Sequence, residues 1–232
     1  MSASTGTTKP VQPPVRKLRN IFAGLLALAA WAVIYFTFYP LPPRFDRGPH
    51  RALGQVLAQE ALKLQQPGGR VFLITRDTAM FKTPAFEAQA EGFRQTLKKA
   101  RVEIAATRLL KVDPLRILGV PPGDFLDLLS KANEKDVIVS LLGPPVLDAG
   151  QLAKLDGSNR PRVLAVCSGA MPRQVDLKQL FDEKLIHAAV INRIEPGASS
   201  GTGRTGDFDR LFKLITPANL ADLPTPLLSD AR

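Results

Sequence analysis

The residues most suggestive of chemistry lie in the stretch "GASSGTGRTGDFD", residues 197–209. Gly201, Gly203 and Gly206 have the spacing G-x-G-x-x-G, which in dinucleotide-binding proteins lets the backbone approach a pyrophosphate. That chemistry needs the first glycine directly after the first strand of a β-α-β unit. Here seven residues, "IEPGASS", separate Gly201 from the preceding apolar run, and no further strand is evident after it. The context favours a Gly/Ser/Thr loop over a phosphate site, and we expect no cofactor.

Cys167 is the second candidate, because "AVCSGAMP" places a thiol between an apolar run and a helical segment, where the pKa of a thiol can fall. A nucleophilic cysteine normally needs a base beside it. His187 begins the next apolar run, so a parallel sheet would place it at the edge opposite Cys167, and His50 follows the apolar N-terminal segment. We therefore expect a buried structural thiol and no clustered metal ligands.

Apolar runs of strand length alternate with helix-length segments after residue 69. The predicted strands are 70–77, 102–110, 136–143, 162–169 and 186–193, and the helices between them are 83–101, 121–135, 148–155 and 174–185. Such alternation implies parallel β-α-β units, hence an α/β three-layer sandwich with a parallel, flavodoxin-like sheet of about five strands. The run 102–110 alternates more than the first, which favours a sheet edge. An α+β mixture with one element assigned wrongly is the alternative.

Two segments, "RVFLITRDTAMFKTPAFEAQAEGFRQTLKKARVEIAATRLL" and "DVIVSLLGPP", carry a resemblance to a known family. Over about residues 70–193 the pattern resembles the N-terminal lobe of type I periplasmic binding proteins, which include sugar receptors and the ligand domain of lactose-repressor-like regulators. The resemblance implies a periplasmic-binding-protein-like sheet and a small-molecule ligand. That family closes a second lobe over its ligand, whereas residues 194–232 are too few to build one, which argues against a clamp mechanism.

In an open parallel sheet, ligands lie beyond the carboxyl ends of the strands, where the strand order reverses. With the order 2-1-3-4-5, that crevice lies between the first and third strands. The candidate ligand-binding residues at these strand ends are Thr75, Arg76, Asp77, Gly143, Pro144, Ser168 and Gly169. Arg76 would pair with an anionic or hydroxyl-rich ligand. The alternative is that Arg76 and Asp77 pair with each other at a turn.

The run "IFAGLLALAAWAVIYFTFY", residues 21–39, has no charged residue and no proline. Its length suits the ~20 residues that a helix needs to cross a bilayer, so it predicts one transmembrane helix. A cleaved signal peptide is the alternative, but the run is longer than a typical signal core of about 7–15 residues and lacks small residues at its end. Flanking cations favour a cytoplasmic N-terminus and an extracytoplasmic domain, as in a bacterial inner-membrane protein facing the periplasm.

The predicted organisation follows from these segments. Residues 1–20 form a polar tail that we expect to be disordered in the cytoplasm. Residues 40–69 form a linker and an amphipathic helix, 70–193 the α/β domain, and 194–232 a Gly-rich loop and C-terminal strap. Within that last segment, 207–215 is expected to fold back as a helix or a strand.

The composition limits the partners. The formal charge is +10, but the chain has two Tyr and one Trp, all in the apolar N-terminal run, so we expect no nucleic-acid binding. We expect contact with a lipid bilayer through residues 21–39, and a protein partner or a homo-oligomer. The preferred hypothesis is a non-enzymatic docking or assembly component of an envelope complex. The alternative is a small-molecule module for a sugar or an anion. An enzyme is the third hypothesis, disfavoured by the missing triad, metal cluster and phosphate loop.

Overall fold

The computed structural model describes residues 14–38, 45–79, 82–111, 119–153, 155, 160–169, 171–193 and 204–223. The chain divides into two compact units, 1–45 and 46–232. The first unit contains the helix α1 (Pro14–Phe38). Within the described residues one helical segment, Leu18–Tyr35, is long and apolar enough to cross a membrane. The predicted disorder of residues 1–20 falls mostly outside the described residues.

The second unit is built on a six-stranded sheet with the order β2-β1-β3-β4-β5-β6. Its strands are β1 (Val71–Arg76), β2 (Ile104–Leu110), β3 (Val137–Ser140), β4 (Arg162–Cys167), β5 (Ala188–Asn192) and β6 (Phe212–Ile215). The first five strands pair in parallel. All five predicted strands and their order are confirmed, and β2 lies at the edge as its alternating pattern indicates.

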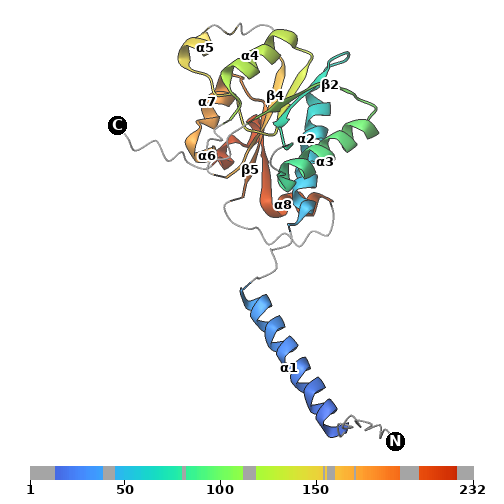
Figure 1. Cartoon of the computed structure of the whole chain (residues 1–232). Helices are drawn as coiled ribbons and strands as arrows, with labels where there is room; N and C mark the ends of the chain where they lie inside the picture. The colour runs from blue at the N-terminus through green and yellow to red at the C-terminus, as the bar shows by residue number, and fades with distance from the viewer. Residues whose placement is uncertain are drawn as a thin grey trace, which may run out of the picture. The chain divides into compact units, whose positions relative to one another are not determined.

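Helices cover both faces of the sheet, which gives the three-layer sandwich that the sequence predicts (Figure 1). One face packs against α2 (Arg47–Leu64), α3 (Pro84–Lys99) and α8 (Arg204–Leu211). The other face packs against α4 (Pro122–Lys131), α6 (Met171–Gln174) and α7 (Leu177–Asp182), and α5 (Ala149–Ala153) lies on the same side of the sheet. Every residue of β1 is buried, because apolar side chains on both sides of the strand meet a helical layer.

The sixth strand differs from the purely parallel sheet that the sequence predicts. Residues 207–215 are expected to form a helix or a strand, and the structure uses them for both. The chain turns back through α8, so β6 runs antiparallel to β5. Phe208 of α8 and Phe212 of β6 are both buried, with ring centroids 5.9 Å apart. Their burial holds this return segment against the sheet edge beyond β5.

The helices α2 and α3 approach each other closely at two glycines. A Cβ at Gly54 would lie 1.9 Å from the carbonyl oxygen of Gln89, and one at Gly92 would lie 2.1 Å from the carbonyl oxygen of Arg51. Any side chain at either glycine would therefore push the helices apart. Arg51 and Arg47 also pair with Glu91 of α3. The predicted amphipathic helix after the linker is thus an integral layer of the α/β unit.

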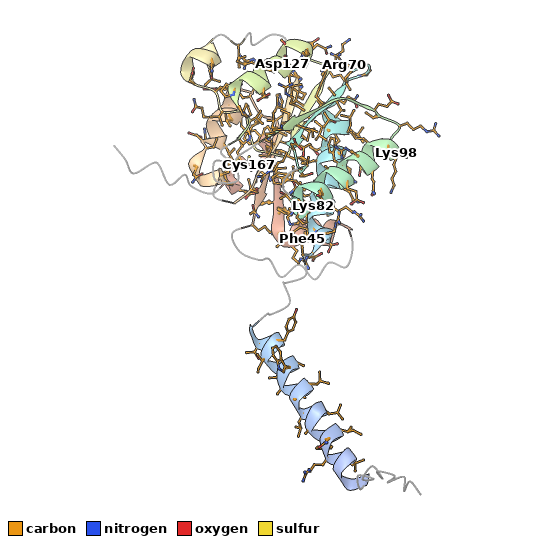
Figure 2. The ribbon with its side chains drawn as sticks, in the orientation of Figure 1. Phe45, Arg70, Lys82, Lys98, Asp127 and Cys167 are labelled. Carbon is orange, nitrogen blue, oxygen red and sulfur yellow. The ribbon has the colours of Figure 1, made fainter. Side chains whose placement is uncertain are left out.

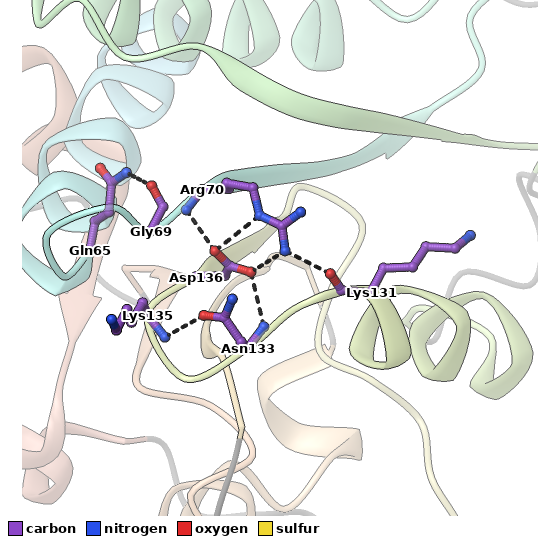
Figure 3. Close-up of polar contacts among 7 residues, drawn as sticks. All are labelled: Gln65, Gly69, Arg70, Lys131, Asn133, Lys135 and Asp136. Carbon is purple, nitrogen blue, oxygen red and sulfur yellow. Dashed lines mark hydrogen bonds and ion pairs between the residues drawn. The ribbon is translucent and has the colours of Figure 1, made fainter.

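At the amino ends of β1 and β3, Asp136 forms the centre of a polar network (Figure 3). Its side chain is fully buried and accepts hydrogen bonds from the Arg70 backbone N–H (2.7 Å), from Arg70 Nη2 (2.8 Å) and from the Asn133 backbone N–H (2.9 Å). Burial alone would raise the pKa of Asp136, but these bonds and the Arg70 charge outweigh burial and lower it. The network joins the two strands at the edge opposite the candidate ligand site.

Candidate functional site

A hollow of about 350 Å³ opens at the carboxyl ends of β1 and β2, beside the N-terminal half of α3. Thr75 and Arg76 end β1 and are 4% and 8% exposed, so the strand presents two buried polar side chains at this edge. Leu109 of β2 is the register partner of Thr75 and also lines the hollow. Parallel pairing therefore brings these residues together although they are distant in sequence.

The turn after β1 supplies Asp77. Its backbone N–H donates to the carbonyl of Leu110 (2.9 Å), which extends the pairing with β2 by one residue. Its carboxylate oxygen Oδ1 accepts a hydrogen bond from the backbone N–H of Ala79 (3.0 Å). This local turn fixes the direction in which the chain leaves the sheet. Asp77 is half-buried and keeps carboxylate acceptor capacity beyond the turn bond.

The helix α3 supplies the other wall of the hollow. Phe86, Glu87 and Ala90 line it from the first turns, and the exposed Arg94 lines it one turn further on. The sequence places Phe86 and Ala90 on the face of this helix that packs against the sheet, and both are at least partly buried there. The sequence does not predict that these two residues line a site, because their helical spacing is equally typical of residues that pack in the core. Their position in the helix that follows β1 is the one feature of the sequence that points to the site.

At the carboxyl end of β3, on one side of the crevice expected between β1 and β3, the chain packs against itself. Gly143 and Pro144 are buried. The backbone N–H of Val120 donates to the carbonyl of Pro144 (3.0 Å), so the segment before α4 pairs with the segment after β3. Gly143 has a φ of +121°, and a Cβ there would lie 2.7 Å from Sδ of Met171. The hollow thus lies on the β2 side of β1, and a ligand role for Gly143 and Pro144 stays a prediction.

Ser168 and Gly169 follow β4 and are exposed. Gly169 has a φ of +66°, and its backbone N–H donates to Oδ1 of Asn192 at the end of β5 (2.9 Å). Neither residue lines the hollow beside β1. The structure therefore groups Thr75, Arg76 and Asp77 and separates them from the other four candidate residues, whose binding role also stays a prediction.

Cys167 is fully buried inside the second unit, and burial raises the pKa of its thiol to about 12 (Figure 2). A buried thiol with a raised pKa carries little thiolate at neutral pH, as expected for a structural cysteine. His187 directly precedes β5, at the amino edge of the sheet, where its backbone N–H donates a hydrogen bond to the carbonyl of Val163. Cys167 ends β4 at the opposite, carboxyl edge. The expected separation of Cys167 from His187 is confirmed. No group of three metal-ligating side chains occurs in the part of the chain that the structure describes.

The glycine-spaced stretch lies partly outside the described residues, since Gly201 and Gly203 precede α8. Gly206 lies within α8, which leads into the antiparallel strand β6. A dinucleotide fingerprint needs a parallel β-α-β unit at this point. The topology around the stretch is therefore different from that of a dinucleotide-binding fold.

The sequence matches no protein-family model and no curated protein. Solved structures similar to the chain include an ABC transporter solute-binding protein from Burkholderia graminis in complex with D-arabinose, at 15% identity and a TM-score of 0.48, covering 76% of this chain and 62% of that one. A sugar-binding protein of a Bacillus halodurans sugar ABC transporter has 16% identity and a TM-score of 0.48, covering 75% of this chain and 64% of the other. A carbohydrate transporter solute-binding protein from Agrobacterium radiobacter in complex with D-arabinose has 17% identity and a TM-score of 0.47, with coverages of 76% and 60%.

The chain spans 60 to 64% of the length of these three proteins. All three are solute-binding or sugar-binding proteins of transporters, the kind of protein that the sequence resembles.

Proposed function

We propose that the chain is a membrane-anchored α/β module that binds a small hydroxyl-rich or anionic molecule, such as a sugar or an anion, in the hollow beside β1. The observation that carries this proposal is the grouping of Thr75, Arg76 and Asp77 with Arg94 around one cavity at the carboxyl edge of the sheet. Two guanidinium groups can donate paired hydrogen bonds to hydroxyl or anionic oxygens. Phe86 offers an apolar face to the carbon skeleton of a ligand.

The test is thermal unfolding of the full chain in detergent micelles against separate sugars, sugar acids, amino acids, nucleotides and inorganic anions. A ligand at about 100 times its dissociation constant stabilises a folded protein by about 2.7 kcal/mol. We expect a shift of several degrees with sugars, sugar acids or inorganic anions. A cooperative transition that no compound shifts would count against a small-molecule site.

A second proposal is that the same unit docks a partner protein in an envelope complex. The observation that favours it is Leu109, a large apolar side chain that is 55% exposed at the rim of the hollow. A partner that packs against Leu109 would cover the rim of the hollow without reaching the buried Arg76. Cross-linking in native membranes tests this proposal. A partner complex that survives Arg76→Ala would separate docking from ligand binding, because the arginine belongs to the hollow.

Membrane anchoring by residues 21–39, with the α/β unit outside the cytoplasm, is part of both proposals. Its support is the apolar segment of α1 and the cations before it. Protease treatment of intact and inverted membrane vesicles tests the topology. Digestion of the α/β unit from the cytoplasmic face would contradict the proposed orientation, and release of the chain by alkaline carbonate would contradict the anchor.

A further inference from the structure

In the part of the chain that the structure describes, no strand pairs with the outer side of β2, the edge strand of the sheet. The strand pairs with β1 alone, and five of its seven residues, 105–109, are exposed. Leu110 directs its carbonyl inward, where it accepts the N–H of Asp77. Because alternate residues of a strand direct their backbone groups to opposite sides, Leu109 and Thr107 direct theirs outward. The described residues provide no backbone partner on that side.

Natural proteins commonly protect an exposed edge with proline, with charged side chains or with a covering segment. No proline occurs within β2. Its one charged residue, Arg108, forms an ion pair with Asp124 of α4 (Nη2 to Oδ1, 2.7 Å), which draws the guanidinium toward the helical layer. As far as the described residues go, the outer backbone of β2 therefore remains accessible to an added strand.

Cations flank this edge at both ends. Lys98, Lys99 and Arg101 precede β2, and Lys111 follows it; all four are exposed, and none forms an ion pair with another described residue. Lys98 extends from the outer side of the unit, near the end of α3 (Figure 2). The exposed Glu103 is a single acidic side chain among them. The positive field therefore favours a partner segment of the opposite charge.

We propose that β2 binds an extended acidic segment of a partner protein by strand addition. The outward backbone groups of Thr107 and Leu109 form the main-chain hydrogen bonds, and the flanking cations select for acidic side chains. This inference rests on the docking proposal above and gives it a surface and a partner chemistry. It does not involve ligand binding in the hollow.

The experiment uses the full chain in detergent micelles and a fluorescent seven-residue peptide in which Glu alternates with Val and Thr. The matched control peptide carries Lys in place of Glu. We expect the acidic peptide to bind at least tenfold more tightly, and raised salt to weaken it. Thr107→Pro removes an outward N–H while leaving the inner ladder in place, so it should weaken binding at least tenfold. Thr107→Ala keeps the N–H and should bind within twofold of the unchanged chain.

A second variant, Lys98→Gln with Lys99→Gln, should lower the affinity for the acidic peptide severalfold and reduce its salt dependence. This variant decides the question if Thr107→Pro lowers the unfolding temperature. Equal binding of the two peptides would overturn the proposal, as would unchanged binding by Thr107→Pro. A dimer of the chain that dissociates on Thr107→Pro would show that a second copy occupies the edge, and would also overturn it. If a partner complex in membranes survives Thr107→Pro, strand addition at β2 is wrong. The docking proposal would then still hold, with the partner bound to another surface.

Discussion

The backbone N–H of Val120, just before α4, donates to the carbonyl of Pro144, just after β3, at 3.0 Å. Ligands of open α/β sheets commonly bind where the strand order reverses, which here is between the carboxyl ends of β1 and β3. At the carboxyl end of β3 the chain packs against itself, and Gly143 lies buried against Met171. The hollow that the described residues form lies instead on the other side of β1, next to β2 and α3.

The packing at Gly143 gives the first prediction. Gly143→Ala places a Cβ 2.7 Å from Sδ of Met171 and forces a residue with a side chain into a φ of +121°. We expect a loss of roughly 1–3 kcal/mol in the free energy of unfolding, measured by urea denaturation. The matched control is Gly123→Ala in α4, where no atom lies within 4 Å of the added Cβ. Equal stability of the two variants would contradict the close packing described here.

Asp136 gives the second prediction, through its buried contacts with Arg70. Asp136→Asn removes the charge that Arg70 neutralises, and we expect it to cost about 2–4 kcal/mol of stability at pH 7. The pKa of Asp136 is lowered in the folded chain, so its contribution is present above the unfolded pKa of about 3.9 and is lost as the pH falls through the lower folded value. Acid unfolding of the variant should show a shallower slope in that range. If the variant loses stability with falling pH as steeply as the unchanged chain does, Asp136 is not the source of this pH dependence.

His187 gives the third prediction, in a different pH range. Burial and the charge of Arg162 lower its pKa to about 4, and its Nδ1 accepts the N–H of Val163 (3.2 Å). Between pH 6.5 and 4 the unfolded chain binds more protons at this position than the folded chain does. Stability should therefore fall as the pH drops through this range and stay level above it.

The measurement is urea unfolding at pH 7.5, 5.5 and 4.5. His187→Asn keeps an acceptor near the Val163 N–H and removes the titrating ring. Between pH 7.5 and 4.5, the free energy of unfolding of this variant should therefore change by about 2 kcal/mol less than that of the unchanged chain. The same pH dependence in this variant and in the parent would rule out His187 as its source.

The layers of this fold can be predicted from the sequence, because its apolar runs are short, continuous and separated by amphipathic segments. The five parallel strands and the edge position of β2 follow from that pattern. The strand β6 is harder to predict, because Phe208 and Phe212 fit a helix and a strand equally well until α8 turns the chain back.

The site is predicted less completely than the fold. Thr75, Arg76 and Asp77 are found because a parallel strand delivers its last residues to the carboxyl edge. The pairing of Val120 with Pro144 is not foreseen, because it depends on backbone hydrogen bonds between segments that no side-chain pattern marks. Arg94 is missed for a related reason: only the orientation of α3 over the sheet brings it to the hollow.

The most direct test of the proposed ligand site compares ligand-induced thermal stabilisation in the full chain and in three variants. Arg76→Gln and Arg94→Ala remove cations from the hollow, whereas Ser168→Ala changes the exposed end of β4 outside it. The unfolding temperatures measured without ligand show whether replacing the buried Arg76 destabilises the fold itself. With the sugar, sugar acid or anion that gives the largest shift, we expect stabilisation of the unchanged chain and of Ser168→Ala, and its loss in both arginine variants. Stabilisation that survives in both arginine variants, or its absence in a cooperatively folded parent chain, would contradict a ligand site in the hollow.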